Sequence, residues 1–212
     1  MAVGKFITLE GGEGAGKSTQ VKRLAQALSD DGLTVVTTRE PGGVPNAEAI
    51  RDLLLATRED PWDPMTEALL HFAARCEHMA RFIRPAMDRG DWVISDRFAD
   101  STMAYQSYGL GVARPAIEAL YRETMGAFHP DLTIILDLPV EDGLERAAGR
   151  GITADRYESM GLDFHNRLRD GFLDIARREP DRCVVLDARP PVDDISEKLI
   201  ATVRDRLESG HD

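Results

Sequence analysis

Five short apolar segments constrain the fold of this 212-residue chain more than any other feature of its sequence. They are Lys5–Glu10, Thr34–Thr38, Trp92–Asp96, Leu132–Leu138 and Cys183–Asp187. A strand with one face in water alternates apolar and polar residues, whereas these segments show almost no alternation, as strands buried on both faces do. Helical patterns fill the stretches between them. The sequence therefore predicts an α/β fold in three α/β/α layers, with a five-stranded parallel sheet surrounded by helices.

The helical stretches are recognised by apolar residues spaced three or four apart. The longest such stripe runs through residues 69–87 and consists of Leu69, Phe72, Cys76, Met79, Ile83 and Met87. The chain contains no internal repeat, linker or low-complexity tract. We therefore expect a single domain that spans residues 1–212.

The charge balance excludes several classes of function. The chain has 37 acidic and 26 basic side chains, for a net charge of −11, so we expect neither nucleic acid nor an anionic membrane as a partner. The first ten residues do not resemble a signal peptide, and no apolar run approaches the roughly 18–20 residues of a membrane span. Cys76 and Cys183 fit no metal or redox spacing, so we expect buried free thiols and a cytoplasmic location.

Only four of the 26 basic residues are lysines, which leaves a marked excess of arginine. Arginine is suited to bidentate contacts with carboxylates and phosphates, so an acidic protein of this kind still has the means to bind an anion at one place. A coding bias toward arginine explains the same count equally well until the arginines are located.

A glycine-rich loop follows the first predicted strand and leads into a helix. It consists of Gly11, Gly12, Glu13, Gly14, Ala15, Gly16, Lys17, Ser18 and Thr19, and it matches G-x-x-x-x-G-K-S. In such a loop backbone amides bind a polyphosphate, Lys17 bridges the β- and γ-phosphates, and the Ser18 hydroxyl binds Mg²⁺. The alternative is a chance glycine-rich turn that opens a helix. The full match in a strand–loop–helix frame favours a nucleoside triphosphate site.

The phosphate loop alone does not choose among GTPases, ATPase motors and small kinases. A GTPase needs an N/T-K-x-D motif, and neither Asn46 nor Asn166 is followed by lysine. A chain this short favours a kinase that acts on a small acceptor. Two alternatives stay open: a related kinase acting on another nucleoside monophosphate or a nucleoside, and a nucleotide-dependent switch with no acceptor.

Further polar motifs follow the predicted strands at the sheet edge where ligands bind in such folds. The runs FITLEGGEGAGKST, TREPGG, HFAAR, ISDRF, STMAYQ and DRYE are similar in order and spacing to those of bacterial thymidylate kinases. The resemblance covers nearly the whole chain. It implies a P-loop kinase that transfers the γ-phosphoryl group of ATP to dTMP, giving dTDP and ADP, with Mg²⁺. It further implies a homodimer, an acceptor-binding region around residues 39–106 and a LID around residues 146–157.

The resemblance also implies which residues bind the acceptor. They are Glu13, Arg39, Pro41, Arg51, Phe72, Arg75, Arg97, Ser101, Thr102, Tyr105, Gln106 and Tyr157. In this scheme Phe72 stacks on thymine and Arg75 binds its carbonyl edge, Arg51 and Arg97 hold the phosphate, and Tyr105 excludes a 2′-hydroxyl. From the residues alone, the core position in its stripe is the favoured interpretation of Phe72, and the alternative for the arginines is a solvated surface position.

The remaining expectations concern catalysis. Asp96 is expected to hold or orient the Mg²⁺ shell together with Ser18, although an aspartate at a strand end is also a common helix cap. Family members take a catalytic arginine from the phosphate loop or from the LID, and residues 12–15 contain no basic side chain. The resemblance therefore points to Arg150, supported by Arg146 on the ATP side, with Lys17, Arg97 and Asp96 completing the catalytic set. The alternative for the LID is a solvated charged loop.

Overall fold

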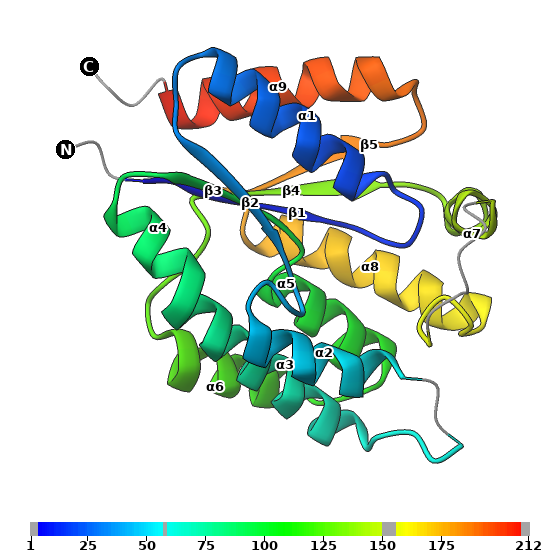
Figure 1. Cartoon of the computed structure of the whole chain (residues 1–212). Helices are drawn as coiled ribbons and strands as arrows, with labels where there is room; N and C mark the ends of the chain where they lie inside the picture. Colours follow the sequence, from blue (N-terminus) through cyan, green and yellow to red (C-terminus); the bar gives the residue numbers. More distant parts are fainter. Residues whose placement is uncertain (1–3, 57–58, 150–155, 209–212) are drawn as a thin grey trace.

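The computed structural model describes residues 4–56, 59–149 and 156–208. Its centre is a five-stranded parallel sheet in the order β2-β3-β1-β4-β5 (Figure 1). The strands are β1 (Phe6–Glu10), β2 (Val35–Arg39), β3 (Trp92–Asp96), β4 (Leu132–Asp137) and β5 (Cys183–Asp187). Each lies within one residue of its predicted position at either end. The predicted α/β fold with a five-stranded parallel sheet is therefore confirmed.

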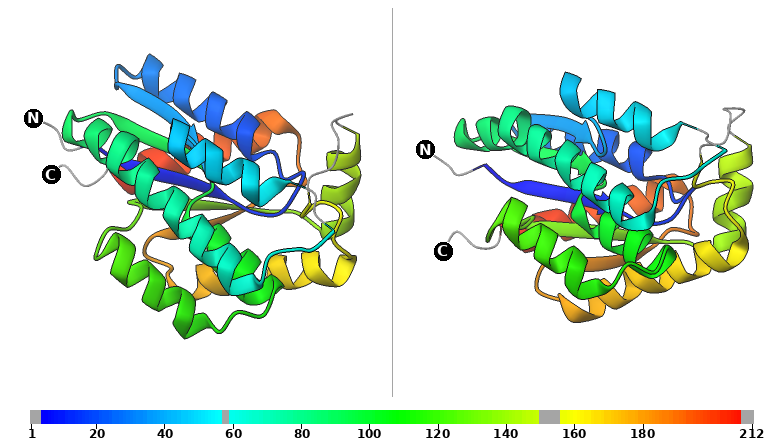
Figure 2. Two further views of the ribbon diagram at one scale, coloured as in Figure 1. Left: turned by 60° about the horizontal axis from the view of Figure 1, so that its bottom comes forward. Right: turned by 90° about the horizontal axis from the view of Figure 1, so that it is seen from below.

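Helices cover both faces of the sheet, so the fold has three layers (Figures 1 and 2). One face is covered by α1 (Lys17–Asp30) and α9 (Val192–Glu208). The other face carries α2 (Pro45–Leu55), α3 (Pro64–His78), η1 (Met79–Ile83), α4 (Arg84–Asp88), α5 (Ala99–Thr102), η2 (Met103–Gly109), α6 (Arg114–Met125) and α8 (Leu162–Arg178). The short α7 (Val140–Ala148) lies beyond the end of β4, at one end of the sheet in Figure 1.

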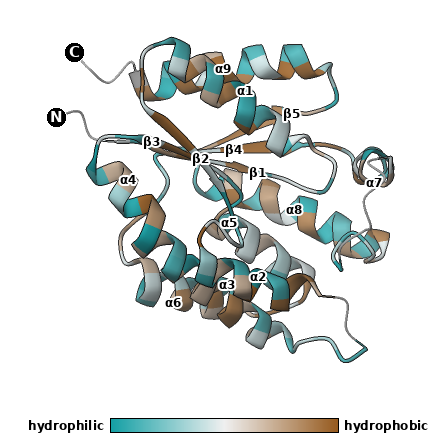
Figure 3. Cartoon of the chain, in the orientation of Figure 1, coloured by the Kyte–Doolittle hydropathy of each residue, from teal (hydrophilic) through white to brown (hydrophobic). Residues whose placement is uncertain are grey.

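The core follows from burial of the central strands on both faces. All five residues of β1 are buried, with Ile7 and Leu9 in the cluster beneath α1 and α9 and Phe6 in the cluster on the opposite face. The hydropathy colouring shows the same distribution, with the apolar residues along the strands and on the helix faces that meet them (Figure 3). This two-sided burial explains why the strand sequences show so little alternation.

The prediction of one apolar stripe through residues 69–87 is partly wrong. Phe72, Met79 and Ile83 are buried, but Leu69 is 49% exposed and Cys76 is exposed, so Cys76 is not the buried thiol that we expected. The buried face of α3 instead includes two polar side chains, Arg75 and His78, which a search for apolar residues does not find. The helix then passes into the π-helical turn η1, whose wider turn changes the register of the residues that follow.

Cys183 is buried as predicted, and burial raises the pKa of its thiol to about 12, so it stays protonated at neutral pH. None of the helices within residues 4–56, 59–149 and 156–208 combines the length and the apolarity that crossing a bilayer requires.

Candidate nucleotide-binding site

A cleft of about 430 Å³ opens at the carboxyl ends of β1, β2 and β3. This is the edge at which ligands bind in doubly wound sheets. The structure gathers most of the sequence-predicted residues on its walls. These are Glu13, Gly14, Gly16, Lys17, Ser18, Thr19, Arg39, Pro41, Arg51, Arg75, Asp96, Arg97, Ser101, Thr102, Tyr105, Gln106, Arg146 and Tyr157. Gly11, Gly12, Ala15 and Phe72 were also predicted, but they do not line the cleft.

The phosphate loop takes the form that its glycines allow. Gly14 has a φ of +67°, and a Cβ at this position would lie 2.0 Å from the carbonyl oxygen of Gly143, so only glycine fits here. The loop runs directly into α1, whose first residue is Lys17. The start of this helix therefore presents unpaired amides and the positive end of the helix dipole, as a polyphosphate requires.

The Lys17 ammonium folds back over the loop. Its Nζ donates to the carbonyl oxygens of Gly12 at 2.7 Å and Gly11 at 3.1 Å. Burial, together with the nearby Arg97 guanidinium, lowers the pKa of Lys17 to about 8. A polyphosphate next to this ammonium would favour its charged form, so binding of such a ligand is coupled to the charge of Lys17.

Ser18 and Asp96 meet at the mouth of the loop. The Ser18 hydroxyl donates to Asp96 Oδ2, which joins the start of α1 to the end of β3. A hydroxyl and a carboxylate provide the oxygen ligands that Mg²⁺ prefers, and they stand beside the loop that would hold a triphosphate. The donor set therefore fits the predicted cation.

Arg97 occupies the point where the phosphate loop meets the acceptor side of the cleft. Its Nη2 donates to Glu13 Oε1 at 2.9 Å, and its Nη1 donates to Gly11 O at 3.0 Å and Ser101 Oγ at 3.2 Å. Burial alone would raise the pKa of Glu13, but Arg97 and Lys17 outweigh it and lower the pKa to about 2. Glu13 is therefore an anion at neutral pH, held between two cations.

Arg75 is held in the floor of the cleft by three partners. Its Nε donates to Glu40 Oε2 at 2.7 Å, and its Nη2 donates to Thr102 Oγ1 at 3.0 Å and to Phe98 O at 3.2 Å. The side chain is only 2% exposed, yet Nη1 has no hydrogen-bond partner among the described residues. A buried unpaired N–H is costly, and Arg75 lines the cleft, so a ligand there is a candidate partner for this donor.

Gln106 presents the complementary group. Its Nε2 donates to Glu67 Oε1 at 2.8 Å and to the Tyr157 hydroxyl at 3.2 Å, while its Oε1 has no partner within the part of the chain that the structure describes. The orientation of the amide is assigned from these contacts, in which Glu67 Oε1 accepts from the amide N–H. Two residues that line the cleft, one on α3 and one on η2, therefore each carry a buried polar atom without a partner among the described residues.

Phe72 does not occupy the position that we predicted for it. It is buried in the core beneath Arg75, whose Cζ lies 4.9 Å from the ring centroid, while the neighbouring His71 lines the cleft in its place. His71 Nε2 is 3.2 Å from the Tyr157 hydroxyl. Burial and the Arg75 charge lower the pKa of His71 to about 3, so the ring is neutral. One signal was present in the sequence, since His71 precedes Arg75 by one helical turn.

Two buried carboxylates in the site were also missed. Glu40 pairs with Arg75 and accepts at Oε1 from His78 Nδ1 across 3.0 Å, which positions the arginine. Glu67 accepts from Gln106, from Tyr157 at 2.6 Å and from Arg156. The carboxyl-terminal part of the predicted LID is therefore tied to α3 through Glu67. Glu40 lies in the TREPGG run, but its sequence neighbours do not show that it is buried, and Glu67 belongs to none of the runs singled out above.

The arginines expected to bind phosphate lie at different depths. Arg51 Nη1 donates to the Pro41 carbonyl at 2.8 Å, and Arg39 forms an exposed ion pair with Glu48 at 2.9 Å. Arg146 extends from α7 and donates to the Ala188 carbonyl at 3.0 Å, beside the loop after β5. Arg150, our predicted catalytic arginine, lies outside the described residues.

Comparisons with known proteins agree with this geometry. A family model described as thymidylate kinase matches residues 9–199. The chain is 55% identical over 207 residues to a thymidylate kinase of Caulobacter vibrioides, and the aligned residues cover 98% of this chain and 99% of that protein. It is 48% identical to a thymidylate kinase of Alkalilimnicola ehrlichii, over 99% of this chain and 98% of the relative.

A solved structure gives the same result. The crystal structure of the thymidylate kinase from Ehrlichia chaffeensis matches with a TM-score of 0.77 and 34% identity, covering 95% of this chain and 99% of that one. The family match, the near-complete coverage of these relatives and the shared three-layer fold lead to one conclusion: this chain is a member of the thymidylate kinase family.

Proposed function

We propose that this chain phosphorylates dTMP to dTDP, with ATP as the phosphoryl donor. The observation that carries the proposal is a pair of buried, unpaired atoms, Arg75 Nη1 and Gln106 Oε1, on two residues that line the cleft. The imide edge of thymine offers a carbonyl acceptor at C4 next to an N3–H donor, which complements this pair. In cytosine the C4 amino group would point a donor at the arginine donor and leave both unpaired, which disfavours CMP and dCMP.

Uracil has the same imide edge as thymine, so the sugar must supply further selectivity against UMP. Tyr105 is buried, its hydroxyl donates to Glu13, and its ring lies under Arg97 with the guanidinium carbon 5.0 Å from the ring centroid. A ring fixed in this way leaves little room beside a deoxyribose. We assign to it the exclusion of a 2′-hydroxyl, while the neutral His71 ring packs against the base.

The phosphoryl transfer itself depends on positioning and charge. Lys17 and the amides of the phosphate loop hold the β- and γ-phosphates, and Arg97 holds the acceptor phosphate next to them, with Arg39 and Arg51 nearer the mouth. Transfer between two bound phosphates needs alignment and charge neutralisation more than it needs a general base. Ser18 and Asp96 would hold Mg²⁺, which when bound neutralises charge on the β- and γ-phosphates.

The LID completes the donor site in this proposal. Arg146 lies beside Ala188 and Arg189, where it faces the donor nucleotide. Arg150 is assigned the transition-state charge on the transferred phosphoryl group, because residues 12–15 of the phosphate loop contain no basic side chain. Arg150→Ala should therefore lower kcat by about 100-fold or more with little change in dTMP binding.

We further propose that the chain acts as one catalytic domain and as a homodimer in the cytoplasm. Two large apolar side chains support the dimer, since Leu53 on α2 and Leu69 on α3 are 44% and 49% exposed on helices that pack against each other. Leu69→Glu should convert a dimer into a monomer in analytical ultracentrifugation. A monomeric parent protein would remove the dimer from the proposal.

A panel of acceptors tests the proposed reaction. ATP and Mg²⁺ are supplied with dTMP, dUMP, UMP, CMP, AMP, GMP or thymidine, and each product is identified by ³¹P NMR. We expect fast formation of dTDP and ADP, with dTMP preferred over the ribonucleotides and thymidine inert. Rapid turnover of UMP or CMP with no reaction of dTMP would refute the assignment. Nucleotide-dependent binding of a partner without any acceptor would support a switch protein instead.

A further inference from the structure

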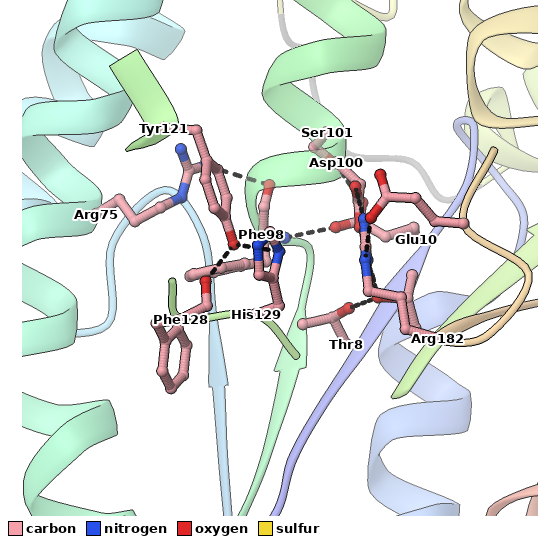
Figure 4. Close-up of polar contacts among 12 residues, drawn as sticks. Thr8, Glu10, Arg75, Phe98, Asp100, Ser101, Tyr121, Phe128, His129 and Arg182 are labelled. Carbon is pink, nitrogen blue, oxygen red and sulfur yellow. Dashed lines mark hydrogen bonds and ion pairs between the residues drawn. The ribbon is translucent and has the colours of Figure 1, made fainter. Parts of the chain in front are cut away.

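Glu10 is a buried carboxylate with no place in the mechanism described above. It ends the central strand β1, directly before the phosphate loop, and its side chain is 0% exposed. Its Oε1 accepts from the Phe98 backbone N–H at 2.7 Å and its Oε2 accepts from the Ser101 hydroxyl at 2.6 Å (Figure 4). Both oxygens therefore hold one short segment, residues 98–101, whose Phe98 and Ser101 line the nucleotide cleft.

The segment that Glu10 holds begins beside a strained residue. Arg97 has a φ of +72°, and no other residue besides glycine has a positive φ in the described part of the chain. This conformation is uncommon for a residue with a side chain, so the surrounding contacts must maintain it. Arg97 N donates to Leu9 O at 3.0 Å, and Ser95 Oγ donates to Arg97 O at 2.7 Å. Glu10 holds the residue that follows.

The contact with Ser101 sets the direction of a hydrogen-bond chain. Because the Ser101 hydroxyl gives its proton to Glu10, its oxygen lone pairs are free to accept from Arg97 Nη1, which lies 3.2 Å away. Arg97 in turn donates to Glu13 at 2.9 Å. The orientation of the guanidinium thus depends on a carboxylate that lies outside the cleft.

The groups around Glu10 disfavour an ionised carboxylate at this position. Burial and the adjacent Asp100 raise the pKa of Glu10 to about 7, and the Ser101 hydrogen bond and Arg97 oppose this rise. Asp100 is itself held by Arg182, whose Nη1 and Nη2 donate to its two oxygens at 2.7 and 2.8 Å, behind the same segment (Figure 4). Burying one carboxylate beside another lowers the stability of the fold. We therefore interpret the presence of Glu10 here as evidence that its hydrogen bonds to Phe98 and Ser101 serve a function.

We propose that Glu10 is a positioning residue for the acceptor phosphate: through Ser101 and the Phe98 amide it fixes the Arg97 guanidinium in the orientation that binds the phosphate of dTMP. This inference rests on the proposed function and extends it to a residue that touches neither nucleotide. Arg97 needs such support because it must meet the phosphate loop and the acceptor at once.

The test uses Glu10→Gln, which keeps the size of the side chain. A glutamine has one acceptor oxygen, so it satisfies the Phe98 amide but turns an N–H toward Ser101, and the serine proton loses its acceptor. We expect the KM for dTMP to rise about tenfold or more while the KM for ATP stays within about twofold. Ser101→Ala should raise the KM for dTMP in the same way, and the double variant should be no worse than the more impaired single variant.

Thr133→Val is the matched control, because Thr133 belongs to the same buried polar layer. It accepts from Arg182 at 2.8 Å, contacts Thr8 at 2.8 Å and donates to Asp100 Oδ2 at 3.4 Å, but none of these contacts involves Phe98 or Ser101. This variant should lower the melting temperature and leave the KM for dTMP unchanged. If Glu10→Gln does not fold, Ser101→Ala keeps the inference falsifiable, since an unchanged KM for dTMP in that variant contradicts the chain of contacts.

Four outcomes separate the possibilities. An unchanged KM for dTMP in a folded Glu10→Gln protein overturns the inference, and so do effects of Glu10→Gln and Ser101→Ala that multiply in the double variant. Equal increases in both nucleotide KM values, matched by Thr133→Val, indicate a merely structural role and also overturn it. A wild-type protein that does not phosphorylate dTMP refutes the proposed function itself, which is measured in the same experiment.

Discussion

Replacing Arg75 by lysine gives the sharpest test of how the acceptor base is recognised. The arginine uses Nε for Glu40 and Nη2 for Phe98 and Thr102, and it keeps Nη1 for the cleft. A lysine has one nitrogen in place of three, so it either keeps the buried ion pair with Glu40 or reaches into the cleft, but it does not do both.

The size of the effect follows from the hydrogen bond to the base that the substitution removes. A hydrogen bond from a charged donor contributes about 1.5–3 kcal/mol, so its removal alone lowers kcat/KM for dTMP by about 10- to 150-fold. The decrease should lie mainly in the KM for dTMP, because the ATP site does not use Arg75. The folded protein should lose about 1–2 kcal/mol of unfolding free energy, since the variant lysine still has the reach to pair with Glu40, which also keeps its hydrogen bond from His78.

The assay compares dTMP with 5-methyl-2-pyrimidinone deoxyribonucleoside 5′-monophosphate, an analogue that lacks the C4 carbonyl and also the N3–H. Rates of ADP release are measured for both acceptors with the wild-type and Arg75→Lys proteins, and thermal melts control for folding. Loss of the N3–H weakens the analogue toward both proteins, so the preference for dTMP should be about 10- to 150-fold larger in the wild type than in the variant. A variant that is weakened equally toward both acceptors, and so retains the wild-type preference, would refute the contact between Arg75 and the C4 carbonyl.

Three further predictions concern other parts of the cleft. Lys17 has a pKa of about 8 without ligand and must be charged to hold a triphosphate, so the affinity for ATP should fall about fivefold between pH 8 and about pH 9. Calorimetry should then show that ATP binding takes up protons, whereas an affinity that does not change with pH would contradict this prediction. Tyr105→Ala should reduce the preference for dTMP over UMP by about tenfold in kcat/KM, and an unchanged ratio would argue against its role at the sugar. Arg146→Ala should raise the KM for ATP about three- to tenfold and leave the KM for dTMP unchanged, whereas the reverse pattern would move Arg146 to the acceptor side.

The parts of this molecule that were predictable from its sequence depend on local patterns. The strands were found because burial on both faces removes alternation, and the phosphate loop was found because its glycines and Lys17 are consecutive in sequence. Glu40 and Glu67 were missed because their partners lie 35 to 90 positions away in the chain, so only the folded structure brings them together. Nothing local in the sequence separates a buried carboxylate of this kind from a solvated one.

The wrong prediction that Phe72, and not His71, faces the cleft also arose because sequence spacing does not show tertiary packing. Both lie on the same side of α3 as Arg75, at three and four positions before it, and the spacing alone does not decide which of them faces the cleft. Packing decides it, because Phe72 has the larger apolar ring and enters the core. The Cys76 and Leu69 errors arise on the same helix, where the polar Arg75 and His78 face inward instead.

The most direct test of the account is a crystal structure of the protein with dTMP and a non-hydrolysable ATP analogue. We predict the thymine C4 oxygen within hydrogen-bond distance of Arg75 Nη1, N3 facing Gln106 Oε1, and the dTMP phosphate on Arg97 opposite the γ-phosphate at Lys17. A dTMP base seated elsewhere in the complex, with Arg75 Nη1 and Gln106 Oε1 bound only to water, would contradict the account.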